Sequence, residues 1–95
     1  MVTFNYTEEF LRQAKRLAKR YRSLADDIDD LQHDLMQNPN IGDSLGGGKR
    51  GGLRVITLNV VIEATDTCVN LLTIYDKKEI QNVSERYINQ IIRNL

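Results

Sequence analysis

The sequence predicts a single α+β domain, in which a small antiparallel sheet carries an N-terminal helical hairpin on one face and is followed by a C-terminal helix. Three observations predict this class. Apolar segments of strand length occur once at the start of the chain and twice in succession in its second half. Apolar residues recur at helical spacing over two adjoining segments of the first half and again at the end. With 95 residues, 41% hydrophobic and 27% charged, residues 1–95 suffice for one core and form one domain.

The first half of the chain predicts a strand followed by two helices. Residues 2–6 alternate and are rich in β-branched and aromatic side chains, which is typical of a short strand. Thr7 is expected to cap the first helix, whose apolar stripe runs from Phe10 to Tyr21. Ser23 is expected to cap the second helix, and Pro39 ends it.

The second half predicts a strand hairpin and a last helix. Residues 53–62 and 69–75 are the two strands, and residues 63–67 form the turn between them. Asn82 is expected to cap the final helix, with Glu85 at its third position. In the first strand one face is apolar (Ile56, Leu58, Val60, Ile62) and the other is more mixed (Val55, Thr57, Asn59, Val61).

The loop at residues 41–52 holds all six glycines of the protein. Because glycine is costly to order, this density indicates either a mobile segment or backbone lying close against a ligand. The order of elements is therefore β-α-α-loop-β-β-α.

Composition and motifs exclude several classes of protein. The chain has no apolar run of membrane-spanning length and no signal-peptide pattern at its start, so we expect a cytoplasmic protein without a membrane partner. Cys68 is the only cysteine, which rules out an internal disulfide and fits a reducing cytoplasm. His33 lies between aspartates on a solvated helix face and is a poor catalytic candidate. The acidic residues follow no known metal-ligand spacing and the glycine loop is not a P-loop, so no metal or cofactor is expected.

Charge is unevenly distributed although the formal net charge is zero. Residues 12–22 contain six basic residues and no acid, whereas residues 26–34 contain five aspartates and no base. The plainer interpretation is that the two blocks pair along the flanks of the helical hairpin; a dedicated nucleic-acid surface is the alternative.

The strand hairpin predicts an anion site. Two antiparallel strands joined by a short turn bring the start of the first beside the end of the second, so Arg54 should lie near Lys77 and Lys78. Lys49 and Arg50 lie on the approach to the same edge. Five cations at one sheet edge would attract an anion, and phosphate is the natural candidate.

Three segments carry a resemblance to a known family. They are residues 10–31, then Gly51-Gly52-Leu53-Arg54-Val55-Ile56-Thr57, and then Leu71-Leu72-Thr73-Ile74-Tyr75-Asp76-Lys77-Lys78-Glu79 followed by Asn82-Val83-Ser84. In this order they resemble the RelE/ParE superfamily of toxins from bacterial type II toxin–antitoxin systems. The resemblance implies a toxin held inactive by a cognate antitoxin. Its RelE-like branch implies a metal-independent endoribonuclease that cuts mRNA in the ribosomal A site.

The chain departs from that family in two places. Family members typically have a further strand before the Gly-Gly-x-Arg piece, but here Gly48 leads straight into Lys49, so one strand is expected to be missing. Ser84 stands where some RelE-like enzymes have a tyrosine at the start of the last helix, and Tyr87 lies one turn further on. We expect Tyr87 to serve packing rather than to substitute for that tyrosine.

The resemblance and the chemistry of RNA cleavage together assign roles to six residues. Arg54 would stabilise the doubly charged phosphorane with its planar fork, and Lys78 would donate a proton to the leaving oxygen. Ser84 occupies the third catalytic position of the family. Lys49, Arg50 and Lys77 would bind RNA phosphates.

Two alternatives to the RelE-type function remain at this point. One is a ParE-like toxin of the same fold that binds and inhibits DNA gyrase. The other is a truncated, inactive toxin that still binds its antitoxin. The expected partners are thus the antitoxin with the ribosome and mRNA, or with gyrase.

Overall fold

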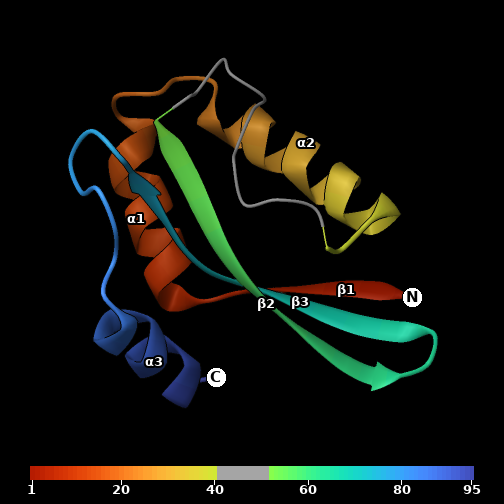
Figure 1. Ribbon diagram of the computed structural model, residues 1–95. Helices are drawn as coiled ribbons and strands as arrows, with labels where there is room; N and C mark the ends of the chain where they lie inside the picture. The colour runs from red at the N-terminus through yellow and green to blue at the C-terminus, as the bar shows by residue number, and fades with distance from the viewer. Residues whose placement is uncertain (41–51) are drawn as a thin grey trace.

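The computed structural model describes residues 1–40 and 52–95, and within them it confirms an α+β domain (Figure 1). The elements follow the predicted order and are β1 (Val2–Tyr6), α1 (Glu8–Ala18), α2 (Leu24–Gln37), β2 (Leu53–Glu63), β3 (Asp66–Asp76) and α3 (Glu85–Arg93). Both hairpin strands are longer than predicted, so the turn between them shortens to residues 64–65. The junction of Gly48 and Lys49, where a family strand is expected to be missing, lies outside the described residues.

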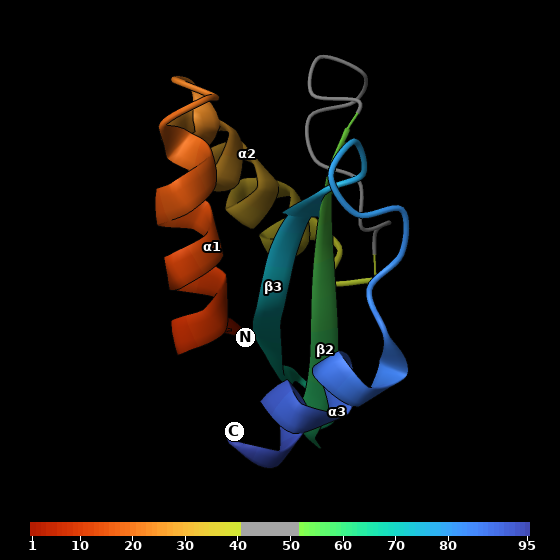
Figure 2. The same ribbon diagram turned by 90° about the vertical axis from the view of Figure 1, so that its left-hand side faces the viewer.

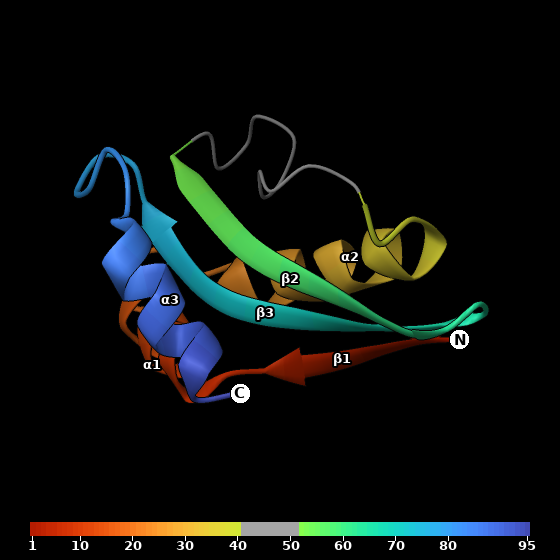
Figure 3. The ribbon, with the colours of Figure 1, turned by 60° about the horizontal axis from the view of Figure 1, so that its bottom comes forward.

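The sheet is mixed, and the prediction of a wholly antiparallel sheet is wrong in this respect. Its strand order is β1-β3-β2, with β2 antiparallel to β3 and β1 parallel to β3. The tight turn forces β2 and β3 to run in opposite directions. No such turn joins β1 to its neighbour, because residues 7–52, which include two helices, separate β1 from the hairpin. The first strand can therefore pair in parallel with the remaining edge of β3 (Figure 3).

A β-bulge interrupts the hairpin in the middle of β3. Ile56 is paired with Thr73 and Thr57 with Leu71, so Leu72 is an extra residue without a partner on β2. Because the extra residue changes which side chains point to which face, Val69, Leu71 and Ile74 all join the same core. The carbonyl of Leu72 accepts a hydrogen bond of 2.7 Å from the hydroxyl of Thr7, at the junction of β1 and α1.

The main core lies between the sheet and the helical hairpin, which covers one side of it (Figure 2). Leu53 and Val55 of β2 are fully buried there, together with Phe10 and Leu17 of α1, Leu24, Leu31 and Leu35 of α2, and Val69, Leu71 and Ile74 of β3. The buried face of β2 is thus the one that looks more mixed in the sequence. On the apolar-looking face Val60 and Ile62 are 44% and 66% exposed, because the far half of β2 extends beyond the helices (Figure 1).

The helix caps agree with the sequence in part. Thr7 caps α1 as predicted, since its hydroxyl accepts a hydrogen bond from the N–H of Phe10. Ser23 occupies the N-cap position of α2, but its hydroxyl bonds to the carboxylate of Asp27 instead of to a backbone N–H. The cap predicted at Asn82 is wrong, because Ser84 caps α3 and accepts from the N–H of Tyr87.

Helix α3 lies on the other side of the sheet. Its Tyr87 hydroxyl is 2.9 Å from the hydroxyl of Thr73, and Thr73 points away from the face that Ile74 contributes to the main core. Ile91 is the buried apolar residue of this helix. Figures 2 and 3 show α3 crossing the strands apart from α2 and next to the first turn of α1.

Thr7 is expected to contribute to stability twice, because its hydroxyl caps α1 and also donates to the bulge in β3. Replacing Thr7→Ala removes both hydrogen bonds and should lower the free energy of unfolding by about 1–2 kcal/mol in chemical denaturation. Thr7→Ser keeps the hydroxyl and should retain most of that stability. Equal stability of the alanine variant and the wild type would contradict this account.

Candidate functional site: a basic edge at the open end of the hairpin

The open end of the strand hairpin brings predicted site residues together. Leu53 is paired with Asp76 and Arg54 with Tyr75, so β2 begins directly beside the end of β3. The N–H of Lys77 then donates a hydrogen bond of 2.6 Å to the carbonyl of Gly52. The backbone therefore places Arg54 next to the turn that carries Lys77 and Lys78. We call Arg54, Lys77 and Lys78 the basic edge.

The three cations differ in how they are held. Arg54 is half-buried, and its guanidinium donates a hydrogen bond of 3.2 Å to the carbonyl of Leu53. Lys77 and Lys78 are exposed. Lys49 and Arg50, which were predicted to approach this edge, lie outside the described residues.

A buried carboxylate, Asp76, lies beneath the basic edge. Its side chain is fully buried, and its Oδ2 accepts hydrogen bonds from the Tyr21 hydroxyl at 2.6 Å and from the Arg20 guanidinium at 3.2 Å. Its Oδ1 accepts from the backbone N–H of Lys78 at 2.9 Å. The sequence alone does not mark Asp76 as a functional residue. In sequence it resembles an ordinary polar residue at the end of a strand, and only the tertiary contact with α1 distinguishes it.

The hydrogen bonds around Asp76 keep its carboxylate ionised. Burial alone would raise the pKa of Asp76, but the hydrogen bonds from Tyr21 and from the Lys78 N–H, with the charges of Arg20 and Lys78, lower it below its ordinary value. The hydrogen bond that the Tyr21 hydroxyl donates to Asp76, together with burial, raises the pKa of the Tyr21 phenol. The group beneath the basic edge is therefore an anion at neutral pH.

The basic block of α1 pairs with this end of the sheet. Arg16 lies 3.2 Å from Glu79, and Arg20 lies 3.2 Å from Asp76 and 3.6 Å from Glu79. A further pair within α1 joins Arg12 to Glu9. We had expected the block to pair with the acidic block of α2, but these contacts, all between described residues, join α1 to the residues at and after the end of β3. Arg16 of α1 and Arg20 of the turn after it thus stand beside the basic edge.

Ser84, predicted as a catalytic residue, serves as the N-cap of α3. Its hydroxyl accepts a hydrogen bond of 3.1 Å from the N–H of Tyr87. Figure 1 shows the chain running away from the end of β3 before α3 begins, so the structure does not bring Ser84 to the basic edge. His33 is exposed on α2 and contacts the carbonyl of Asp29 in its own helix.

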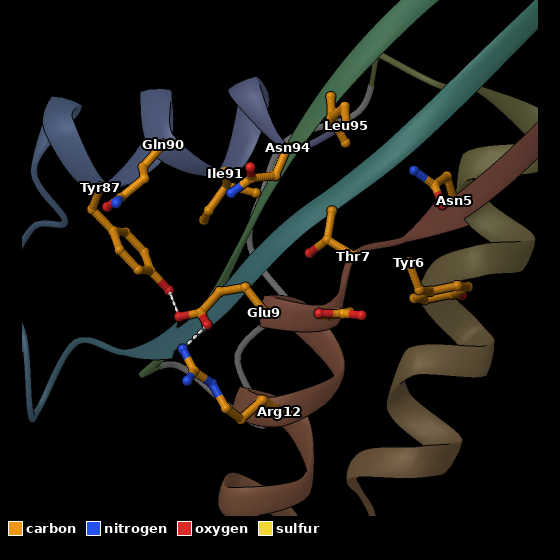
Figure 4. A pocket seen from close by; sticks show the side chains of 11 residues that line it. Asn5, Tyr6, Thr7, Glu9, Arg12, Tyr87, Gln90, Ile91, Asn94 and Leu95 are labelled. Carbon is orange, nitrogen blue, oxygen red and sulfur yellow. Dashed lines mark hydrogen bonds and ion pairs between the residues drawn. The ribbon is translucent and has the colours of Figure 1, made fainter.

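Tyr87 belongs to a second cluster, in a groove of about 780 Å³ between the end of β1, the first turn of α1 and α3 (Figure 4). Its hydroxyl donates to the carboxylate of Glu9, which also accepts from Arg12 and Gln13. Burial raises the pKa of Glu9, but these hydrogen bonds outweigh it and leave that pKa lowered. Burial and the contact with Glu9 raise the pKa of Tyr87 to about 12. The packing role expected for Tyr87 therefore includes a polar anchor for α3.

Any functional assignment of this chain rests on its own residues, because comparisons with known proteins suggest no family. No protein-family model and no curated protein matches the chain. Among residues 1–40 and 52–95, no helix has the length and apolarity needed to cross a bilayer. In the same residues no three side chains of histidine, cysteine, aspartate or glutamate gather in a way that could hold a metal ion.

The phenol of Tyr87 should titrate with a pKa of about 12, against 10.0 for an ordinary tyrosine. The folded protein then retains a proton that the unfolded chain loses above pH 10, so the stability contributed by Tyr87 is full below pH 10 and disappears as the pH rises through 12. The difference in unfolding free energy between the wild type and Tyr87→Phe should accordingly shrink over this interval. Tyrosinate absorbance of the two proteins measures the pKa directly, and a titration of Tyr87 near the ordinary value would contradict the buried contact with Glu9.

Proposed function

We propose that the chain is a RelE-type toxin of a type II toxin–antitoxin system, an mRNA interferase that cleaves mRNA on the ribosome and is neutralised by a cognate antitoxin. One observation carries the proposal: the hairpin register sets Arg54 beside Lys77 and Lys78 at a single sheet edge. The α+β order of elements and the sequence resemblance are consistent with it. In this function the protein acts in the cytoplasm, and its partners are the antitoxin, the ribosome and mRNA.

The basic edge suits a metal-independent cleavage of RNA. A ribose 2′-OH gives up its proton to water and attacks the adjacent phosphorus, and the bond from phosphorus to the 5′-oxygen breaks, leaving a 2′,3′-cyclic phosphate and, once the leaving oxygen is protonated, a free 5′-hydroxyl. Arg54 would hold two phosphate oxygens with its planar fork and stabilise the extra charge of the phosphorane. The ammonium of Lys78 would give a proton to the leaving 5′-oxygen, while Lys77 would bind a neighbouring phosphate. Arg54 stays protonated and so cannot act as the base.

The positions of Ser84 and Tyr87 favour a second candidate function. The Ser84 hydroxyl caps α3, and the Tyr87 hydroxyl is bound by Glu9 and Thr73 on the other side of the sheet. Each hydroxyl is thus engaged in a contact that holds α3, whereas RNA cleavage needs a group that accepts or donates a proton. A ParE-like toxin that inhibits DNA gyrase by binding needs no such group. A truncated toxin that only binds its antitoxin is equally free of this requirement.

Arg54→Ala should abolish most of the proposed activity. In a reconstituted translation reaction, with cleaved mRNA ends read by sequencing, we expect its rate of ribosome-dependent cleavage to fall by about a hundredfold, because one fixed charge donor to the phosphorane is lost. Arg54→Lys keeps the charge but loses the fork and should be intermediate. Arg93→Ala removes an exposed arginine from the last turn of α3 and serves as the matched control, with cleavage unchanged.

Two results would decide between the candidates. Intact mRNA ends together with inhibited supercoiling by purified gyrase would replace the RelE-type function with the ParE-like one. Cleavage by Arg54→Ala at the wild-type rate would show that the basic edge is not where the reaction occurs.

A further inference from the structure

We infer that Asp76 is a positioning residue for anion binding: its buried carboxylate fixes the turn that carries Lys77 and Lys78, and it holds Arg20, which follows α1, at the same end of the sheet. The inference rests on the proposed anion-binding function of the basic edge. Asp76 is negatively charged and itself repels an anion. If only electrostatics mattered, removing its charge would tighten anion binding; if Asp76 positions the cations, removing it weakens anion binding.

The turn after β3 is organised around Asp76. Its side chain accepts from the N–H of Lys78 at 2.9 Å, and its backbone carbonyl accepts from Glu79 at 2.9 Å and Ile80 at 3.0 Å. One residue therefore binds three successive N–H groups of the segment that carries the lysines. This geometry sets the direction in which the Lys77 and Lys78 side chains leave the sheet.

The start of β2 is fitted closely against the same carboxylate. The carbonyl of Gly52 accepts from the N–H of Lys77 at 2.6 Å, and a Cβ added at Gly52 would lie only 2.7 Å from Oδ1 of Asp76. That distance is shorter than van der Waals contact allows, so residue 52 must lack a side chain for β2 and the turn to approach in this way. Arg54 follows two residues later and is thereby fixed relative to the lysines.

The turn after α1 supplies the charge that balances Asp76. Arg20 contacts Oδ2 at 3.2 Å while its side chain remains 54% exposed, so part of the guanidinium still faces solvent at the basic edge. Tyr21 binds the same oxygen at 2.6 Å. A buried carboxylate without such partners would be strongly unfavourable. The pairing leaves the three cations of the basic edge without a net opposing charge beneath them.

The charge and the shape of Asp76 can be separated by substitution. Asp76→Asn keeps an oxygen for the Lys78 N–H but removes the charge that holds Arg20. The substitution also raises the net charge of the protein by one, which on electrostatic grounds alone tightens the binding of an anion. If Asp76 positions the cations, the same substitution must instead weaken binding. Asp30→Asn is the matched control, because it removes one negative charge in the same way at an exposed position of α2.

The test is a titration of each folded protein with inorganic pyrophosphate, followed by the amide NMR signals of Arg54, Lys77 and Lys78, beside a measurement of kcat and KM for ribosome-dependent cleavage. We expect Asp76→Asn to bind pyrophosphate about tenfold more weakly, and to lower kcat by about tenfold or more, because misplaced charges stabilise a transition state poorly. Asp30→Asn should bind pyrophosphate within about twofold of the wild type, because the altered charge lies away from the basic edge. Equal or tighter binding by Asp76→Asn would overturn the inference, and so would a wild type whose basic-edge signals do not respond to pyrophosphate.

The two proposals fail in distinguishable ways. If the wild type binds pyrophosphate at these residues and Asp76→Asn weakens that binding, but neither protein cleaves mRNA, the positioning role holds and the nuclease function is wrong. Should Asp76→Asn not fold, Gly52→Ala takes its place, because it retains every charge and pushes a methyl group against Oδ1. Weaker binding by that variant supports the inference, and unchanged binding overturns it.

Discussion

The contact of the Asp76 carboxylate with Arg20, Tyr21 and the Lys78 N–H is the interaction on which the basic edge depends. It joins the end of α1 to the end of β3, and the start of β2 closes against it through Gly52. A buried charge stays in place only where every partner is present, so this contact makes the position of one segment depend on the others. The turn that carries Lys77 and Lys78 is therefore placed by a carboxylate.

The bulge at Leu72 separates two chemically different surfaces. Beyond it Ile74 and Asp76 face the helical hairpin, while Thr73 faces α3 and bonds to Tyr87. Cations gather at the open end of the hairpin, whereas the groove beside α3 holds Glu9 with Tyr87 bound to it. For RNA cleavage this means that the basic edge supplies charge stabilisation, while the hydroxyls of Ser84 and Tyr87 are engaged in contacts that hold α3. The same property makes a binding toxin the natural competing hypothesis.

The sequence predicted those features that depend on local chemistry or on hairpin geometry. The cap at Thr7 follows from its side chain and position, and the approach of Arg54 to Lys77 follows from any tight antiparallel hairpin. The parallel pairing of β1 and the bulge at Leu72 were not predictable in this way, because apolar and polar residues do not alternate regularly along β3 and so do not mark its faces. Asn82 and Ser84 are both good cap residues, and tertiary packing of α3 decides between them. Asp76 was missed because its significance comes from α1, which is more than fifty residues away in sequence.

Native-state hydrogen exchange at the Lys77 and Lys78 amides tests the central claim most directly. Both N–H groups donate hydrogen bonds that hold the turn after β3, Lys77 to the Gly52 carbonyl and Lys78 to the Asp76 carboxylate. If these two hydrogen bonds fix the basic edge, both amides should exchange nearly as slowly as the amides of β3, because the bonds open only when the end of the sheet opens. Exchange of the Lys78 amide at the rate of an unstructured chain would show that the turn is not held, and the account of the site would then be wrong.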